Sequence, residues 1–219
     1  MKYQIKEIKI TDELYPEKLK HIYDPPKTLY CIGNVSLLNN YSIAIIGCRN
    51  ASDYGLKISK IFADNLSKIG VTIISGFANG IDSESHRASL NNIGKTIAVF
   101  ACGLDYIYPE ENKMLYYEIL KNDGLIISEY PLGVKPIKEY FPNRNRIISG
   151  LSSGVLVVEA KRKSGTMITV RHALDQGRDV FVIPGNIDSI NSTGTNELIK
   201  EGAKMVTNYK EIIENHLFT

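Results

Sequence analysis

Residues 71–82 have the sequence Val-Thr-Ile-Ile-Ser-Gly-Phe-Ala-Asn-Gly-Ile-Asp. Four β-branched residues, 71–74, lead directly into a loop that contains two glycines. An apolar run without polar alternation is typical of a strand buried on both faces, as in a parallel sheet between two helical layers. Glycines just after such a strand let the backbone approach a ligand closely. The stretch therefore predicts a parallel strand followed by a ligand-binding loop.

The same pattern recurs along the chain from residue 41. Short apolar runs alternate with longer segments of helical period, and the runs are 43–46, 71–74, 96–100, 125–127, 155–158, 180–183 and, more weakly, 204–206. Alternating strands and helices predict right-handed crossovers. We expect an α/β fold with a doubly wound, mostly parallel sheet and helices on both faces.

Helix ends and breakers divide the chain further. Ser52 or Asp53 is expected to cap a helix over 54–69, and Ser164 one that ends near residue 176. Residues 1–40 contain three prolines and only short apolar runs, with a short helix expected over 15–22 and a strand over 29–32. We predict an N-terminal segment, 1–40, packed on a core domain, 41–219.

Composition excludes several classes of protein. The chain is 43% hydrophobic and 23% charged, as is ordinary for a globular protein. Its three cysteines are far apart and its four histidines form no ligand-spaced pair, so buried, reduced thiols and no metal site are expected. The sequence contains no signal-peptide core and no run long enough to span a membrane. We expect a cytoplasmic protein without a cofactor.

Basic residues concentrate in one part of the chain. Residues 135–178 contain nine lysines and arginines but three acidic residues, whereas the whole chain has a net charge of +2. A local basic region favours an anionic partner. A solvated, lysine-rich surface is the alternative.

The loops after the strands could bind phosphate. None contains the dinucleotide fingerprint or a Walker A motif, so dinucleotide oxidoreductases and P-loop NTPases lose their main support. Ser164, Gly165 and Thr166 are expected to place free N–H groups and two hydroxyls at a helix N-terminus, next to Lys163. Arg49 could add a bidentate contact. The alternative is that Ser164 and Gly165 only cap the helix.

Asp82 and His86 are four residues apart on an expected helix and therefore share a face. They could form a catalytic or metal pair. An interior hydrogen bond that locks the helix to its loop is the favoured interpretation, because no third partner is evident.

Residues 138–146 interleave aromatic and cationic side chains, namely Lys138, Phe141, Arg144 and Arg146 with Tyr140. Such combinations hold single strands, because cations follow the phosphates and rings stack on bases. Pro142 is expected to start a short helix over 143–149 that presents Arg144 to the ligand. Alternatively, Phe141 belongs to the core and the arginines form structural ion pairs.

Together these residues resemble the DNA-processing protein A (DprA/Smf) family over about residues 10–210. The motifs are Gly47-x-Arg49, Ser75-Gly76-x-Ala78-x-Gly80-Ile81-Asp82-x-x-x-His86, Phe141-Pro142-x-Arg144-Asn145-Arg146, Val157-Val158-Glu159-Ala160, Lys163-Ser164-Gly165-Thr166 and Pro184-Gly185-Asn186. The resemblance implies an extended Rossmann-like core that binds DNA and is not an enzyme. It also implies that the protein protects incoming single-stranded DNA and helps load the RecA recombinase in natural transformation.

The resemblance also implies site residues and an interface. DNA contacts are expected at Arg49, Lys138, Phe141, Arg144, Arg146, Lys163, Ser164, Gly165 and Thr166. A homodimer is expected through the last helix and strand, at Asn196, Ile199 and Met205. Many family members have a helical domain before the core and a winged-helix-like domain after it, and neither is expected in these 219 residues.

Three other functions stay open at this point. A phosphoribohydrolase needs a Pro-Gly-Gly-x-Gly-Thr-x-x-Glu motif, but here Pro184-Gly185 is separated from Gly194-Thr195-Asn196-Glu197. A small-nucleotide sensor would use the glycine loops without stacking on Phe141. A RecA-interaction scaffold would bind DNA only weakly.

Overall fold

A computed structural model describes residues 4–217, with side chains to residue 214. Its strands form one nine-stranded sheet, in the order β1 (Ile5–Lys9), β2 (Thr28–Gly33), β6 (Leu125–Ser128), β5 (Thr96–Phe100), β4 (Thr72–Ser75), β3 (Ser42–Ile46), β7 (Gly154–Val157), β8 (Asp179–Val182) and β9 (Lys204–Met205). The seven strands from β6 to β9 are parallel. The predicted mostly parallel α/β fold is confirmed.

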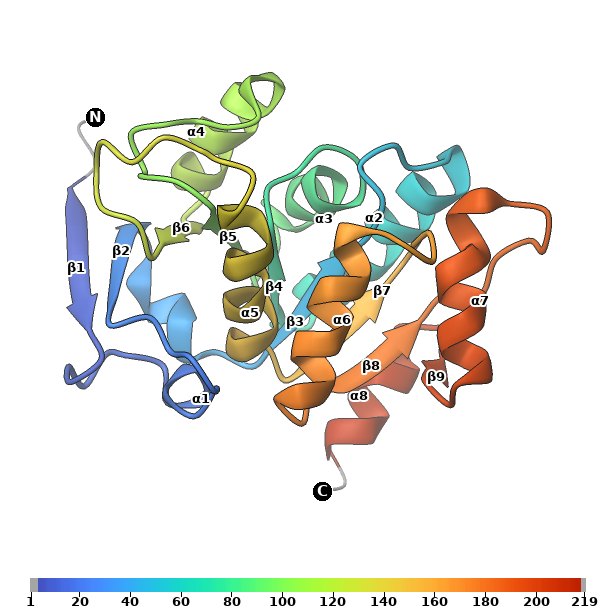
Figure 1. Cartoon of the computed structure of the whole chain (residues 1–219). Helices are drawn as coiled ribbons and strands as arrows, with labels where there is room; N and C mark the ends of the chain where they lie inside the picture. The colour runs from blue at the N-terminus through green and yellow to red at the C-terminus, as the bar shows by residue number, and fades with distance from the viewer. Residues whose placement is uncertain (1–3, 218–219) are drawn as a thin grey trace.

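Helices cover both faces of the sheet (Figure 1). One face packs against α1 (Glu17–Lys20), α5 (Tyr140–Leu151), α6 (Gly165–Asp175) and α7 (Thr193–Lys200). The other packs against α2 (Asp53–Lys68), α3 (Ile81–Ser89), α4 (Lys113–Lys121) and α8 (Lys210–Leu217). Alternate strand residues enter opposite cores, as Ile43 and Ala44 do in β3. The sheet is therefore doubly wound, as predicted.

The sequence pattern missed β1, whereas the strand expected over 29–32 is present as β2. β1 and β2 are antiparallel strands that extend the sheet beyond β6, so residues 4–40 contribute two strands to it. The expected helix over 15–22 is only the four-residue α1. Three short 3-10 helices also connect the elements, at η1 (Val35–Asn39), η2 (Glu110–Asn112) and η3 (Ile190–Ser192). The predicted units 1–40 and 41–219 include residues 1–3 and 218–219, which lie outside the described residues.

The order in which strands are added to the sheet changes sides at the parallel neighbours β3 and β7. Strands β4, β5 and β6 follow β3 on one side, whereas β7, β8 and β9 follow it on the other. The loops that leave β3 and β7 therefore diverge and leave a crevice at the carboxyl ends of the strands, where open α/β sheets bind ligands. The Arg49 loop and the segment 158–164 are those two loops.

Asp82 and His86 lie on α3 and do not bind each other. His86 shares a 2.6 Å hydrogen bond with the Thr96 hydroxyl, whereas Asp82 accepts the Gly76 amide at 3.1 Å. Each side chain thus ties α3 to a neighbouring strand or loop, which supports the structural interpretation. Burial lowers the pKa of His86 to about 3.

The low pKa of His86 predicts that stability falls in acid. Since unfolding restores a pKa near 6.5, the unfolded chain binds the extra proton below that pH, and stability present above pH 6.5 is lost as pH falls toward 3. The loss approaches about 1.4 kcal/mol per pH unit. Urea unfolding of the native chain and of His86→Gln should show a steeper acid loss in the native chain. If the stability of the two proteins changed with pH in parallel, the low pKa of His86 would be contradicted.

Candidate functional site

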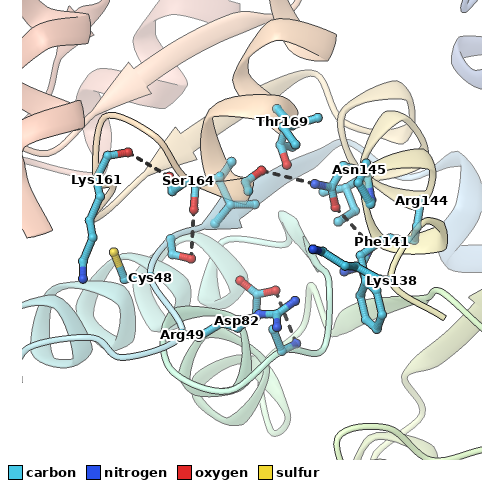
Figure 2. Close-up of a pocket in the computed structure, with 18 of the residues that line it drawn as sticks. Cys48, Arg49, Asp82, Lys138, Phe141, Arg144, Asn145, Lys161, Ser164 and Thr169 are labelled. Atoms are coloured by element: carbon cyan, nitrogen blue, oxygen red, sulfur yellow. Dashed lines mark hydrogen bonds between the residues drawn. The ribbon is translucent and has the colours of Figure 1, made fainter. Parts of the chain in front are cut away.

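The crevice at the carboxyl ends of β3 and β7 contains a cavity of about 730 Å³. Figure 2 shows its walls, which are the Arg49 loop, α5 with the residues just before it, and the start of α6. Seven of the nine predicted contact residues line it, namely Arg49, Lys138, Phe141, Arg144, Ser164, Gly165 and Thr166. The volume suits a ligand of nucleotide size.

Arg49 and Phe141 face each other across this cavity. The guanidinium carbon of Arg49 is 5.4 Å from the centroid of the Phe141 ring, which is cation–π distance. The Tyr108 ring lies 5.7 Å from Phe141 and is half exposed. Lys138, one turn before Phe141, is exposed and also lines the cavity. Two cations and two rings therefore meet at one opening.

The Arg49 loop is held by its neighbours. The buried Glu159 carboxylate accepts the Ser52 amide at 3.0 Å, and the Ser52 hydroxyl caps α2 by accepting the Gly55 amide at 3.1 Å. Gly80, with φ +80°, is required because a side chain there would collide with the carbonyl oxygens of Cys48 and Arg49. The loop thus presents Arg49 from a fixed backbone.

The start of α6 differs from the start of α2. Ser164 occupies the N-cap position, but its hydroxyl donates to the Lys161 carbonyl at 2.9 Å and accepts no helix amide. The Thr166 hydroxyl donates to the Gly47 carbonyl at 3.1 Å. The two hydroxyls lie at the helix N-terminus as expected, but both donate to backbone carbonyls. The first N–H groups of a helix have no intrahelical acceptor, so they remain the donors at this end of the cavity.

Arg144 forms the floor of the cavity and is only 5% exposed. Its guanidinium donates to the carbonyls of Gly76 and Val99 and faces Asp82. Burial lowers the pKa of Arg144 to about 10, against the opposing effect of Asp82. Burial raises the pKa of Asp82, and Arg144 opposes that rise. Arg144 therefore keeps its charge at neutral pH.

Arg146 and Lys163 do not line this cavity. Arg146 binds the Glu129 carboxylate at 2.7 Å and the Asp24 carboxylate at 3.0 Å. Lys163 is exposed on the loop before α6. The predicted helix over 143–149 begins three residues earlier, at Tyr140, so Phe141 and Pro142 lie in its first turn. Arg144 is buried against the Gly76 and Val99 carbonyls rather than exposed at the opening.

Sequence reasoning missed Tyr108, Asn145 and Thr169 at this site. Asn145 donates to the Gly165 carbonyl at 3.4 Å and so connects α5 to α6, which lie side by side in Figure 1. Tyr108 lies in the long connection after β5, beyond the first residues after the strand. No sequence signal pointed to it.

Residues 6–217 match the family model of DNA recombination-mediator protein A. The chain belongs to this family. DNA processing protein DprA of Streptococcus pneumoniae is 46% identical over 209 residues, which are 95% of this chain and 73% of that protein. Protein Smf of Escherichia coli is 45% identical over 94% of the chain, and the chain spans only 55% of its length.

Solved structures of DNA processing protein A agree with this fold. The X-ray structure from Streptococcus pneumoniae superposes with a TM-score of 0.91 at 44% identity, over 96% of this chain and 74% of that one. A structure from Helicobacter pylori, described by its single-stranded DNA binding mode, gives 0.87 at 35% identity over 99% and 97%. A molybdenum cofactor binding protein from Rippkaea orientalis shares the fold alone, with a TM-score of 0.57 at 15% identity.

Asp82→Ala is expected to destabilise this family member by about 3 kcal/mol, because it removes a buried acceptor and leaves the Arg144 charge opposed only by carbonyls. Urea unfolding at neutral pH measures the loss. Glu84→Ala on the same helix is the control and should cost less than about 1 kcal/mol. Equal losses in the two variants would show that Asp82 does not balance Arg144.

Proposed function

We propose that this chain binds single-stranded DNA in the crevice between β3 and β7. The observation that carries the proposal is the Arg49 guanidinium over the Phe141 ring, beside the exposed Lys138. Cations that follow phosphates and rings that stack on bases are the two components of single-strand recognition. The open N–H groups of α6 supply a further phosphate contact.

Single strands suit this site better than a duplex. Phe141 is half-buried between Arg49 and Tyr108, so it can stack only with a base that enters the crevice. Bases of a duplex are already stacked and paired, and their extrusion costs a few kcal/mol. The Helicobacter pylori relative, which covers the chain almost completely and is described as binding single-stranded DNA, supports the same ligand.

Within the site we assign different roles to the predicted contacts. Arg49, Lys138, Ser164, Gly165 and Thr166 bind phosphates, the last three through the backbone, and Phe141 stacks. Arg144 positions the crevice from within, whereas Arg146 serves an ion pair with Glu129. Lys163 adds exposed charge next to α6.

A binding function without catalysis is part of the proposal. Glu197, the glutamate of the split phosphoribohydrolase-like motif, pairs with Arg162 at 3.0 Å. Within the described residues no cluster of His, Cys, Asp and Glu could hold a metal ion. No helix there has the length and apolarity to cross a bilayer. Single-stranded DNA as ligand implies work in the cytoplasm.

Family membership supports two partners of this chain, the RecA recombinase and a second copy of the chain. We propose that it protects incoming DNA and helps load RecA in natural transformation. We also propose a homodimer through α7 and β9, where Met205 is half exposed on the strand at the end of the sheet and Ile199 is half-buried. Asn196 bonds both backbone groups of Gly185, so it shapes the interface rather than joining the subunits.

Salt dependence separates charge from stacking in this proposal. Arg49→Ala and Lys138→Ala should each weaken the binding of labelled single strands. Each should also make the plot of log binding constant against log salt concentration less steep by about 0.7, because each removes a phosphate contact. Phe141→Ala should weaken binding about 5- to 150-fold with little change in slope, because stacking of ~1–3 kcal/mol releases few counterions. Fluorescence anisotropy over several salt concentrations measures both.

Lys57→Ala, an exposed lysine on α2 outside the cavity, is the matched control. Native binding by all four variants, or saturation of the site by a mononucleotide, would refute the proposal and favour a small-nucleotide sensor.

Gly165→Ala tests whether the start of α6 binds phosphate or only begins a helix. A methyl group at Gly165 meets no protein atom within 4 Å, so the variant should fold and gain up to about 1 kcal/mol from helix propensity. The same methyl would obstruct a phosphate, and DNA binding should fall about tenfold. If Gly165→Ala is stable and binds DNA as tightly as the native chain, Gly165 has only a structural role.

A further inference from the structure

A second cavity of about 720 Å³ adjoins the first and shares Arg49, Ala78, Tyr108, Pro136 and Phe141 with it. The Phe141–Tyr108 ring pair therefore stands between the two cavities. The remaining wall comes mainly from the connection between β5 and α4, and includes Tyr106, Glu110, Glu111, Lys113 and Tyr117. The proposed DNA contacts do not use these residues.

The charges of this second cavity do not suit phosphate. Three carboxylates line it, at Asp105, Glu110 and Glu111, against two cations, Arg49 and Lys113. Four aromatic side chains also line it, those of Tyr106, Tyr108, Tyr117 and Phe141, and Tyr108 and Tyr117 are each 48% exposed. Exposed rings beside carboxylates favour a flat, uncharged ligand that donates hydrogen bonds. A nucleobase has that chemistry, whereas a phosphate group is repelled.

Two of the three carboxylates are available to such a ligand. Both oxygens of Asp105 accept the Gly133 amide at 3.0 Å, so this side chain holds the loop 131–134. Glu110 and Glu111 are exposed on η2, and no side chain within residues 4–214 pairs with either one. η2 itself is anchored by Asn112, which donates to the Phe77 carbonyl at 2.9 Å.

We propose that this second cavity is a base-selective subsite, in which Glu110 and Glu111 accept hydrogen bonds from the exocyclic amino group of a base. The subsite rests on the proposed function, because the strand must first cross Phe141. A strand held by its phosphates at Arg49 and stacked on Phe141 places the next base on the Tyr108 side of the rings. Carboxylates accept from the cytosine N4 amino group, whereas thymine presents a carbonyl oxygen there and is repelled.

The comparison of oligo-dC with oligo-dT tests this preference, because the two pyrimidines are similar in size and present an amino donor (cytosine N4) or a carbonyl acceptor (thymine O4) at position 4. Anisotropy with labelled strands of equal length, at neutral pH, should give at least about fivefold tighter binding of oligo-dC. The double variant Glu110→Gln/Glu111→Gln should bind oligo-dC and oligo-dT almost equally, because a glutamine amide can donate to or accept from either base.

Glu118→Gln on α4 removes the same kind of charge outside both cavities and should keep the full preference. Equal binding of oligo-dC and oligo-dT by the native chain, with both still weakened by Arg49→Ala, would overturn the subsite and leave single-strand binding intact. A preference that survives in the double variant would also overturn it. Failure of both strands to bind would instead remove the proposed function, and the subsite with it.

Discussion

The Arg144 guanidinium is a permanent charge held in the interior of the protein, and the arrangement of the crevice depends on it. It extends from α5 to the carbonyls of Gly76 and Val99, so it joins that helix to the ends of β4 and β5. Burial of an unpaired charge is prohibitively costly, and Asp82 on α3 supplies the opposite charge. Gly76 must be glycine, because its Cβ would lie 2.7 Å from the guanidinium. Lys138 and Phe141 take their positions from the helix that this contact fixes.

Periodicity and loop position together predicted most of the fold and the location of the site. Six of the seven parallel strands, all but β9, are built on continuous apolar runs, and burial on both faces leaves such runs few alternatives. β1 could not be predicted in this way, because its residues 5–9 include three charged side chains and only Ile8 of its side chains is buried. Its place depends on backbone pairing with β2, which residue type does not reveal.

Prediction of individual site residues was less complete, since the burial of a side chain depends on tertiary contacts that residue type does not reveal. Pro142 suggested a helix that starts near residue 143 and presents Arg144 to the ligand, but the helix begins at Tyr140 and Arg144 is buried against the Gly76 and Val99 carbonyls. Charge alone did not show that Arg146 pairs with Glu129 and Asp24. Arg49, by contrast, lies in the loop after β3 and Phe141 in the first turn of α5, and the structure places them together at the crevice.

The unlike chemistry of the two joined cavities has a consequence for strand direction. The wall at α6 offers backbone N–H groups, the middle offers Arg49 and Phe141, and the far wall offers two carboxylates. A nucleic-acid strand has a direction. Reversing that direction in the crevice changes which side of each phosphate carries the neighbouring base. A crevice with chemically different ends therefore distinguishes the two orientations. Every copy of this crevice that binds a strand would therefore hold it in the same direction.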